Sequence, residues 1–225
     1  MTGGRLVIFD MDGTLIDSQN VIVASMRRAF ETLGHAAPER ERTLSIVGLS
    51  LPEAMRELAP ELGAETRRDL VDAYRSGFVA IRAEHGGAGN SPLYPGARAA
   101  LERLRDEAGT LLGVATGKAR RGLDHCLDMH RLQGFFTTCQ AADDHPSKPH
   151  PSMIETALAE TGIDAPDGVM VGDTEFDVAM GRAAGVRTIG VCWGYHDEDR
   201  LRAAGADAVV ADFGELLNEL SESGR

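Results

Sequence analysis

The sequence predicts an α/β fold, with helices covering a doubly wound parallel sheet and an all-helical segment inserted near its start. Short apolar runs alternate with amphipathic stretches along most of the chain, as is typical of this class. Several runs are apolar at every position, as expected of strands buried on both faces. One long segment, from residue 17 to residue 84, lacks clear strands and shows the three- and four-residue spacing of helices.

Six short β-rich runs are the predicted strands of the sheet. They are Leu6–Phe9, Leu111–Ala115, Phe135–Cys139, Gly168–Val171, Thr188–Val191 and Ala208–Val210. Six amphipathic stretches are the predicted helices of the same domain: Gly96–Glu107, Ala119–His130, Pro151–Thr161, Glu175–Ala184, Glu198–Ala204 and Phe213–Ser221. Pro151 suits the first turn of its helix, and Gly162 and Gly185 stand where helices are expected to stop.

The helical segment is predicted to be an inserted domain. Its three helices are expected over Val21–Leu33, Pro52–Leu62 and Glu65–Ala83. The following stretch Gly86–Pro95 is rich in Gly, Pro and Ser, which is typical of a linker. We therefore expect residues 1–16 and 90–225 to form the α/β domain and residues 17–89 to form the helical one.

The charge balance excludes one class of partner. The 225 residues include 23 basic and 35 acidic ones, a formal net charge of −12. A general nucleic-acid binder needs a basic surface, so nucleic acid is not an expected partner, whereas a local anion site remains open. Only two of the basic residues are lysines, Lys118 and Lys148, and the other 21 are arginines. Because the chain has so few lysines, the position of each one in the sequence is informative.

No feature predicts a membrane or an oxidising compartment. No apolar run approaches the ~18–20 residues that span a bilayer, and the first strand is expected at Leu6, which leaves no room for a secretory signal. The three cysteines have no paired spacing, so neither a disulfide framework nor a zinc site is indicated. We expect a cytoplasmic protein.

Two carboxylates follow the first predicted strand. Asp10 and Asp12 stand just where ligands bind in an open parallel sheet, outside the carboxyl ends of its strands. Their mutual repulsion is costly unless a cation offsets it, and a hard divalent cation prefers oxygen ligands. Gly13 permits a tight turn and Thr14 offers a hydroxyl. The alternative is an ordinary surface turn, in which Asp and Gly are common.

Both lysines also follow predicted strands. Thr116, Gly117 and Lys118 end the second strand and together offer a hydroxyl, a backbone N–H and an ammonium to phosphate oxygens. A surface turn is the alternative there. Lys148 stands in Ser-Lys-Pro-His-Pro, whose prolines stiffen the backbone that carries the ammonium. Its alternative is an exposed loop lysine.

A third acidic group follows the strand predicted to end at Val171. Asp173 stands at the strand end, and Asp177 begins the next helix four residues later. Either carboxylate could complete a metal site with Asp10. The alternatives are helix capping by Asp173 or Thr174 and a favourable interaction of Asp177 with the helix dipole.

Taken together, these motifs resemble the haloacid dehalogenase-like (HAD) hydrolase superfamily. The segments VIFDMDGTLIDS, ATGK, SKPHP and VGDTEFD occur in the family's order, and four ordered motifs are far more specific than one. The resemblance covers essentially the whole chain and is nearest to the subfamily with a helical cap, which includes phosphoglycolate phosphatases. It implies a Rossmann-like core, an inserted cap and Mg²⁺ as cofactor.

The resemblance also implies a role for each site residue. Asp10 would be the nucleophile that forms an aspartyl-phosphate, and Asp12 the general acid and base. Lys148 would neutralise Asp10 and the phosphate. Further roles are implied for Thr116, Gly117 and Lys118, as contacts of the phosphate or substrate, and for Asp10, Asp12, Asp173 and Asp177, as the metal site.

The expected activity is hydrolysis of a small phosphorylated metabolite, phosphoglycolate-like, by a monomer or homodimer. Asp12 favours phosphate esters, because dehalogenases and phosphonate-cleaving relatives of the family lack it. A phosphomutase of the β-phosphoglucomutase type, a pyrophosphatase, a sugar-phosphate or nucleotide phosphatase and a catalytically idle binding module are the alternatives. Residues 46–51 resemble the cap's substrate-facing loop, or form a helix–helix turn. Four cap arginines either bind a substrate carboxylate or lie on solvated helix faces: Arg27, Arg56, Arg67 and Arg68.

Overall fold

Six parallel strands form one sheet in the order β3-β2-β1-β4-β5-β6. The structure is a computed structural model that describes residues 4–84 and 91–222. The strands are β1 (Arg5–Phe9), β2 (Thr110–Thr116), β3 (Thr138–Ala141), β4 (Gly168–Gly172), β5 (Arg187–Val191) and β6 (Ala208–Val210). Most of their side chains are buried, which confirms the predicted doubly wound α/β class.

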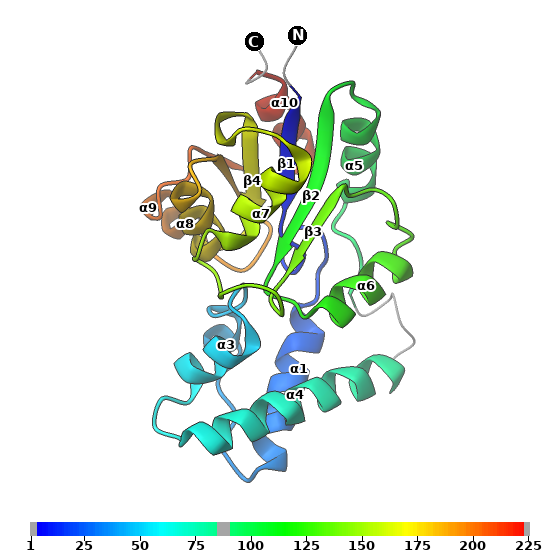
Figure 1. Cartoon of the computed structure of the whole chain (residues 1–225). Coiled ribbons are helices and arrows are strands. Elements are labelled where there is room, and N and C mark those ends of the chain that lie inside the picture. The colour runs from blue at the N-terminus through cyan, green and yellow to red at the C-terminus, as the bar shows by residue number, and fades with distance from the viewer. Residues whose placement is uncertain (1–3, 85–90, 223–225) are drawn as a thin grey trace.

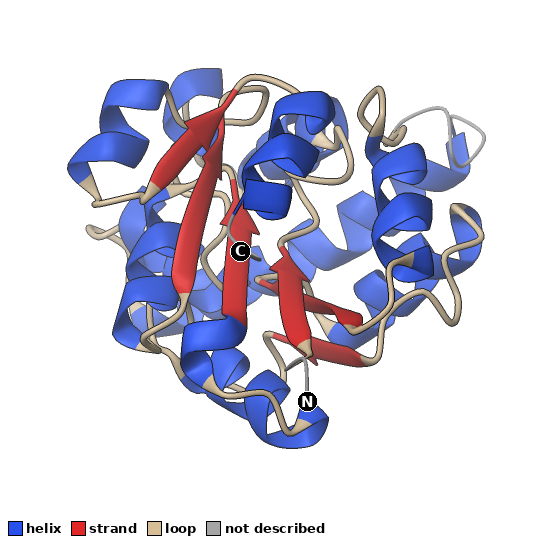
Figure 2. Cartoon of the chain, turned by 90° about the horizontal axis from the view of Figure 1, so that it is seen from above, coloured by secondary structure: helices blue, strands red, loops and turns tan. Residues whose placement is uncertain are grey.

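Helices cover both faces of this sheet (Figures 1 and 2). The core helices are α5 (Ala97–Asp106), α6 (Arg120–Met129), α7 (Ser152–Thr161), α8 (Glu175–Ala183), α9 (Glu198–Ala203) and α10 (Phe213–Glu222), with a short 3₁₀ turn η2 (Ala165–Asp167) before β4. One apolar cluster joins α5, α6 and α10 to the sheet, and a second joins α7 and α8 to its other face. Among the described residues, no helix is long and apolar enough to cross a membrane.

The predicted strand Phe135–Cys139 is displaced in the structure, where β3 begins at Thr138 and ends at Ala141. The apolar signal came from Phe135 and Phe136, which pack against the core from the preceding turn. The strand itself carries Thr138 and Gln140, whose polar side chains bond Glu160 at 2.5 and 2.8 Å. A buried polar network therefore hid this strand from a search for apolar runs.

The inserted segment is a helical cap, with helices α1 (Gln19–Thr32), α2 (Arg40–Leu44), α3 (Leu51–Leu58) and α4 (Ala64–Glu84). Helices α1, α3 and α4 share their own apolar cluster. Helix α2 was not predicted, and α3 ends four residues early because Ala59 precedes Pro60, which disfavours helical backbone. The predicted linker Gly86–Pro95 and the boundary near residue 90 fall largely outside the described residues, so both stay predictions.

The cap lies at the carboxyl ends of the strands (Figure 1). Its two connections to the core run side by side, since Ile16 and Leu93 form an antiparallel bridge. The Asp17 amide donates to the Pro92 carbonyl at 2.8 Å beside this bridge. Two adjacent segments of chain therefore join the cap to the core at the end of the sheet where the strands terminate.

The cap also contacts the core through its own loop, residues 45–50. The Ser50 amide donates to Ser147 Oγ at 2.8 Å. The Glu175 amide donates to His196 Nδ1, so His196 Nε2 carries the hydrogen that it shares with the Ser45 carbonyl at 3.1 Å. On the other side of the interface, Arg82 Nη2 lies 3.6 Å from Met129 Sδ. The cap is therefore held at both sides of its interface with the core.

The core backbone lies close to this loop at Gly117. A Cβ at Gly117 would lie 2.5 Å from the Gly48 carbonyl oxygen and 2.8 Å from that of Leu49. We expect Gly117→Ala to displace residues 46–50 and to break the Ser50 hydrogen bond. Hydrogen exchange should then show faster exchange at the Ser50 amide, while helix α4 keeps its protection.

Gly122→Ala is the matched control for this substitution. Its Cβ would meet only the Lys118 side chain, at 3.8 Å, so the cap loop should exchange as in the natural protein. Unchanged exchange at Ser50 in Gly117→Ala would show that the loop does not depend on this close approach.

Candidate active site

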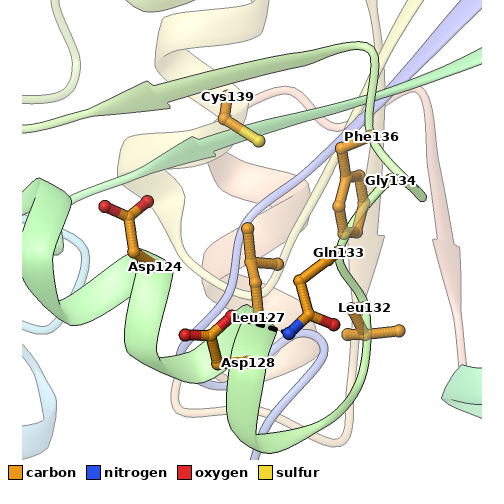
Figure 3. A pocket seen from close by; sticks show the side chains of 8 residues that line it. All are labelled: Asp124, Leu127, Asp128, Leu132, Gln133, Gly134, Phe136 and Cys139. Carbon is orange, nitrogen blue, oxygen red and sulfur yellow. Dashed lines mark hydrogen bonds between the residues drawn. The ribbon is translucent and has the colours of Figure 1, made fainter.

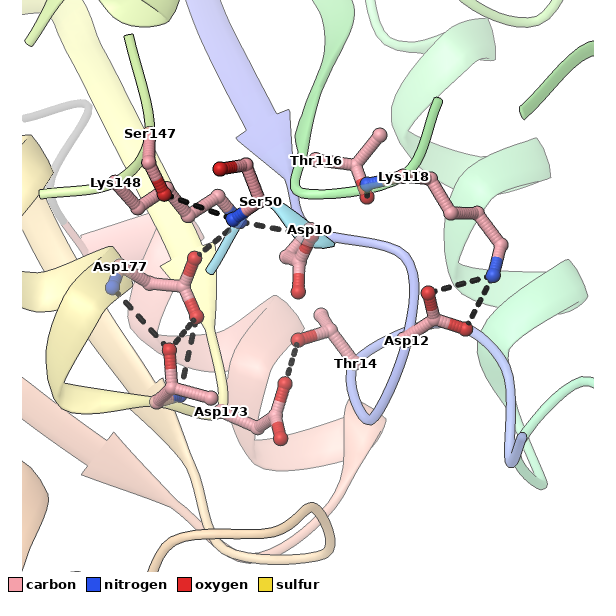
Figure 4. A network of polar contacts seen from close by, with 11 residues as sticks. Asp10, Asp12, Thr14, Ser50, Thr116, Lys118, Ser147, Lys148, Asp173 and Asp177 are labelled. Atoms are coloured by element: carbon pink, nitrogen blue, oxygen red, sulfur yellow. Dashed lines mark hydrogen bonds and ion pairs between the residues drawn. The ribbon is translucent and has the colours of Figure 1, made fainter. Parts of the chain in front are cut away.

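Residues predicted from separate motifs come together at the carboxyl ends of the strands (Figure 4). Asp10 follows β1, Thr116 ends β2, and Asp173 follows β4. Strands β2, β1 and β4 are adjacent in the sheet, so the three side chains lie at one edge of it. Lys148 reaches the same point from the loop after β3. This edge is the candidate active site.

The ammonium of Lys148 is buried among carboxylates. Its Nζ lies 2.9 Å from Asp10 Oδ1 and 2.6 Å from Asp177 Oδ1, and the side chain has no exposed surface. Burial lowers the pKa of Lys148, but the two carboxylates outweigh burial and leave that pKa raised. Lys148 is therefore a permanent cation in the site, and the alternative of an exposed loop lysine is wrong.

Asp10 is buried and has little to stabilise its charge. Apart from the ion pair with Lys148, neither carboxylate oxygen accepts a hydrogen bond from any described residue. Burial raises the pKa of Asp10 to about 6, opposed by Lys148 and reinforced by Asp177 and Asp12. A buried carboxylate with free oxygens can receive a cation or act as a nucleophile.

Asp173 is held rigidly beside it. The Thr14 hydroxyl donates to Oδ1 at 2.8 Å, and the Tyr195 amide donates to Oδ2 at 2.9 Å. A Cβ at Gly13 or at Gly194 would lie 2.2 Å from the Asp173 side chain, so only glycine leaves room for it. Burial, then Asp177 and Asp10, raise the pKa of Asp173 well above its usual range.

Asp177 contacts both the start of helix α8 and the buried ammonium. Its Oδ2 accepts hydrogen bonds from the Thr174 amide at 3.1 Å and the Thr174 hydroxyl at 2.6 Å, in the capping box that begins helix α8. Its Oδ1 accepts from Lys148. Asp177 thus ties the start of α8 to the buried ammonium, with Thr174 as the N-cap.

Three of these carboxylates form a possible metal site. One oxygen each from Asp10, Asp173 and Asp177 can be chosen so that all three lie within 4.8 Å of one another, and all three residues are buried. Only Lys148 among the described residues neutralises this cluster directly. A hard cation with oxygen ligands would relieve the remaining repulsion and lower the raised pKa values. The donor set therefore fits a divalent metal.

Asp12 lies apart from this cluster, toward Lys118 (Figure 4). Lys118 Nζ contacts both carboxylate oxygens, at 2.7 and 2.6 Å. Ser18 donates a further hydrogen bond to Oδ1, and its own oxygen lies 3.1 Å from the Tyr195 hydroxyl. The partner of Lys118 in this structure is Asp12, so its predicted substrate contact stays a prediction. Ser18 was missed, although it lies in the first motif.

A cavity of about 1550 Å³ opens between this site and the cap. Asp10, Asp12, Thr116, Gly117 and Lys118 line it from the core, and the predicted substrate-facing loop lines it from the cap. A smaller pocket of about 330 Å³ lies away from the strand ends, at helix α6 (Figure 3). The two pockets share Asp124 and Asp128, but none of the predicted site residues lines the smaller one. The larger cavity is therefore the candidate substrate site.

The four cap arginines are not among the described residues that line this cavity. Arg56 pairs with Glu53 on the same helix at 2.7 Å, and Arg67 donates to the Leu62 carbonyl at 2.7 Å. The alternative of arginines outside the site therefore describes Arg27, Arg56, Arg67 and Arg68 here.

We expect Lys148→Met to destabilise the protein, because it leaves buried carboxylates without their cation. Removing one partner of a buried ion pair costs about 3–5 kcal/mol. The loss of stability should be smaller at low pH. Because the unpaired carboxylates have raised pKa values, the folded state binds more protons than the unfolded state. The free energy of unfolding therefore falls as pH rises. Denaturant unfolding in the presence of a chelator at pH 5.5 and 8 would measure both effects.

The double variant Lys148→Met/Asp177→Asn tests the cause. It removes one of the carboxylates that Lys148 pairs with, so it should unfold at higher denaturant concentration than Lys148→Met alone. A loss of stability that is independent of pH, and is not reduced by Asp177→Asn, would attribute the effect to packing instead.

Known proteins share both the sequence and this architecture. The family model for haloacid dehalogenase-like hydrolases matches residues 7–191. A protein named "Probable phosphatase IndB" from Dickeya dadantii is 34% identical, over 94% of this chain and 91% of its own. The pyrophosphatase PpaX of Bacillus pumilus is 32% identical, over 94% of each chain.

More distant relatives carry the name that the motifs suggested. The phosphoglycolate phosphatase of Vibrio cholerae is 28% identical, over 95% of each chain. The crystal structure of a predicted phosphatase from Clostridium acetobutylicum superimposes with a TM-score of 0.85 at 27% identity, over 98% of this chain and 99% of its own. The strand-end motifs, the capped α/β architecture and these matches establish that the chain belongs to the haloacid dehalogenase-like hydrolases and is a phosphatase of that family.

Proposed function

We propose that this phosphatase is a magnesium-dependent phosphomonoester hydrolase that acts through an aspartyl-phosphate on a small organic phosphate. One observation carries the proposal: Asp10 is buried beside a permanent cation, lines the cavity, and has carboxylate oxygens that accept no hydrogen bond from any described residue other than Lys148. An ionised carboxylate in this setting is poorly solvated and is free to attack.

The proposed first step uses both acidic residues that follow β1. An Asp10 oxygen attacks the phosphorus in line, and the phosphorus–oxygen bond to the alcohol breaks. Asp12, in its protonated form, gives its proton to the leaving oxygen. Lys148 neutralises Asp10 and the transferring group, while Thr116 Oγ1 and the Gly117 N–H hold phosphoryl oxygens. The products are the free alcohol and phosphorylated Asp10.

The second step returns the site to its starting state. Asp12, now ionised, takes a proton from water, and the resulting hydroxide attacks the phosphorus. The bond to Asp10 breaks, which releases inorganic phosphate and leaves Asp12 protonated for the next turnover. Asp10, Asp173, Asp177 and the backbone carbonyl of Asp12 are the groups that would hold Mg²⁺. When bound, this ion supplies positive charge to the phosphoryl oxygens.

The substrate is proposed as a small phosphorylated metabolite, phosphoglycolate-like. A second candidate is inorganic pyrophosphate, favoured by the 32% identity to a pyrophosphatase. A phosphomutase would yield an isomer without free phosphate from β-glucose 1-phosphate and a trace of the bisphosphate. A panel of small phosphates ranked by kcat/KM separates these functions. A cytoplasmic location and a monomer or homodimer stay predictions.

We expect Asp10→Asn to abolish phosphate release from p-nitrophenyl phosphate, because an amide cannot form the acyl phosphate. Chelation should stop the natural enzyme and Mg²⁺ should restore it. Mass spectrometry of acid-quenched natural enzyme should find one added phosphoryl group, absent in Asp10→Asn.

Asp199→Asn, on the exposed face of α9, is the control and should behave as the natural enzyme. Turnover by a correctly folded Asp10→Asn, or phosphate release that needs no metal, would rule out this mechanism.

We expect Asp12→Ala to lose more activity on alkyl phosphates than on p-nitrophenyl phosphate. An alkoxide needs a proton in order to leave, whereas nitrophenolate leaves without one; general acids contribute about 10²–10⁴-fold. The ratio of kcat values for the two substrates, in natural and variant enzyme, is the measurement. An equal loss on both would show that Asp12 is not the acid.

A further inference from the structure

The cavity above the site has room for far more than a phosphoryl group. Its volume is about 1550 Å³. The cap is already seated around it, since Ser50 bonds Ser147 on one side and Arg82 meets Met129 on the other. The space therefore lies between two cap–core contacts, and the residues that line it indicate which chemical groups it suits.

One wall that the cap gives the cavity, on helix α4, lies close to Asp12. In the proposed mechanism the leaving alcohol is beside Asp12, because Asp12 protonates it. Lys118 binds Asp12 at 2.6 Å, and the same Nζ lies 5.3 Å from the centre of the Phe78 ring on helix α4. Phe78 is thus separated from the acid by a single side chain, and α4 faces the alcohol part of the substrate.

This part of α4 is apolar toward the cavity. Tyr74 and Phe78 lie one turn apart with ring centres 5.9 Å from each other, and both line the cavity with Val79. Val79 is 58% exposed, the one large hydrophobic side chain among the described residues with such exposure. Ile22 and Met26 of helix α1 continue the wall. We name Tyr74, Phe78 and Val79 the α4 wall.

Charged side chains along the cavity largely compensate one another. Arg75 is 3.6 Å from Asp72, and Arg82 lies over the Phe78 ring at 5.6 Å. Apart from the strand-end carboxylates and Lys118, the lining holds four arginines and four acids: Arg75, Arg82, Arg120, Arg121, Glu53, Asp124, Asp128 and Asp143. Beyond the phosphoryl end, the walls thus provide apolar surface and no excess of positive charge.

We propose that the leaving alcohol of the natural substrate carries an extended apolar group, aromatic or alkyl, that packs on the α4 wall. This inference rests on the proposed phosphomonoesterase function and narrows its substrate class. A two-carbon acid would leave the wall in contact with water, and pyrophosphate would place a second phosphate beside it. Burying an apolar group there instead gains about 25 cal/mol per Å².

Two phosphates with leaving alcohols of similar acidity test the inference. We compare kcat/KM for 3-phenylpropyl phosphate and ethyl phosphate, with Mg²⁺ and the full chain. The phenylpropyl ester should be favoured by at least about tenfold, since burial of a single methylene is worth a few-fold. Phosphoglycolate and pyrophosphate are measured beside them and should fall below the phenylpropyl ester.

Val79→Asp should reduce this preference by placing a carboxylate in the wall. Ser76→Asp is the matched control, because Ser76 is exposed on the same helix and does not line the cavity. It should keep the natural ratio of the two kcat/KM values. As a measurement independent of folding of the variants, 3-phenylpropylphosphonate should inhibit the natural enzyme at lower concentration than ethylphosphonate.

The outcomes separate this inference from the proposed function. Equal kcat/KM for the two alkyl phosphates, or the highest value for phosphoglycolate or pyrophosphate, would overturn the inference and leave the phosphatase intact. An equal effect of Val79→Asp and Ser76→Asp on the ratio would also overturn it. If no phosphate is released from any of these compounds or from p-nitrophenyl phosphate, the proposed function itself fails.

Discussion

The site depends on one buried ammonium among carboxylates. Asp10, Asp173 and Asp177 gather where three strand ends meet, and burial and mutual repulsion raise the pKa values of Asp10 and Asp173. Lys148 offsets part of this repulsion, and its two ion pairs connect the strand that carries Asp10 to the helix that Asp177 begins. Because a single lysine cannot neutralise three carboxylates, the cluster stays short of positive charge, which favours a cation and an anionic phosphoryl group.

The topology explains why so much of this cluster could be predicted. In a parallel sheet every strand ends at the same edge, so motifs far apart in the sequence converge without any knowledge of their loops. Asp10 and Asp173 directly follow apolar strands, and Thr116 is the last residue of another. The position of Lys148 was harder to predict, because β3 carries the polar residues Thr138 and Gln140 and the apolar run before it forms a turn. Even there the position of the lysine was right although the strand was misplaced.

What the sequence could not provide is the partner of each side chain. Lys118 stands in a motif typical of phosphate contacts, yet its ammonium lies on Asp12, a choice that depends on how the first loop folds. Ser18 joins that pair only because the chain turns back before α1. Which face of α4 lines the cavity depends on how the cap helices pack. Helical periodicity shows where the apolar face of a helix lies, but it does not show which element packs against that face.

The two lysines have different surroundings, and only Lys118 is among the described residues that line the cavity. Lys148 is fully buried and forms ion pairs with two core carboxylates, so its surroundings suit any phosphoryl group. Lys118 links Asp12 to Phe78, so the residue proposed as the general acid shares a neighbour with the α4 wall. A change of cap residues near Phe78 can therefore alter which alcohol is accepted without disturbing the buried cluster.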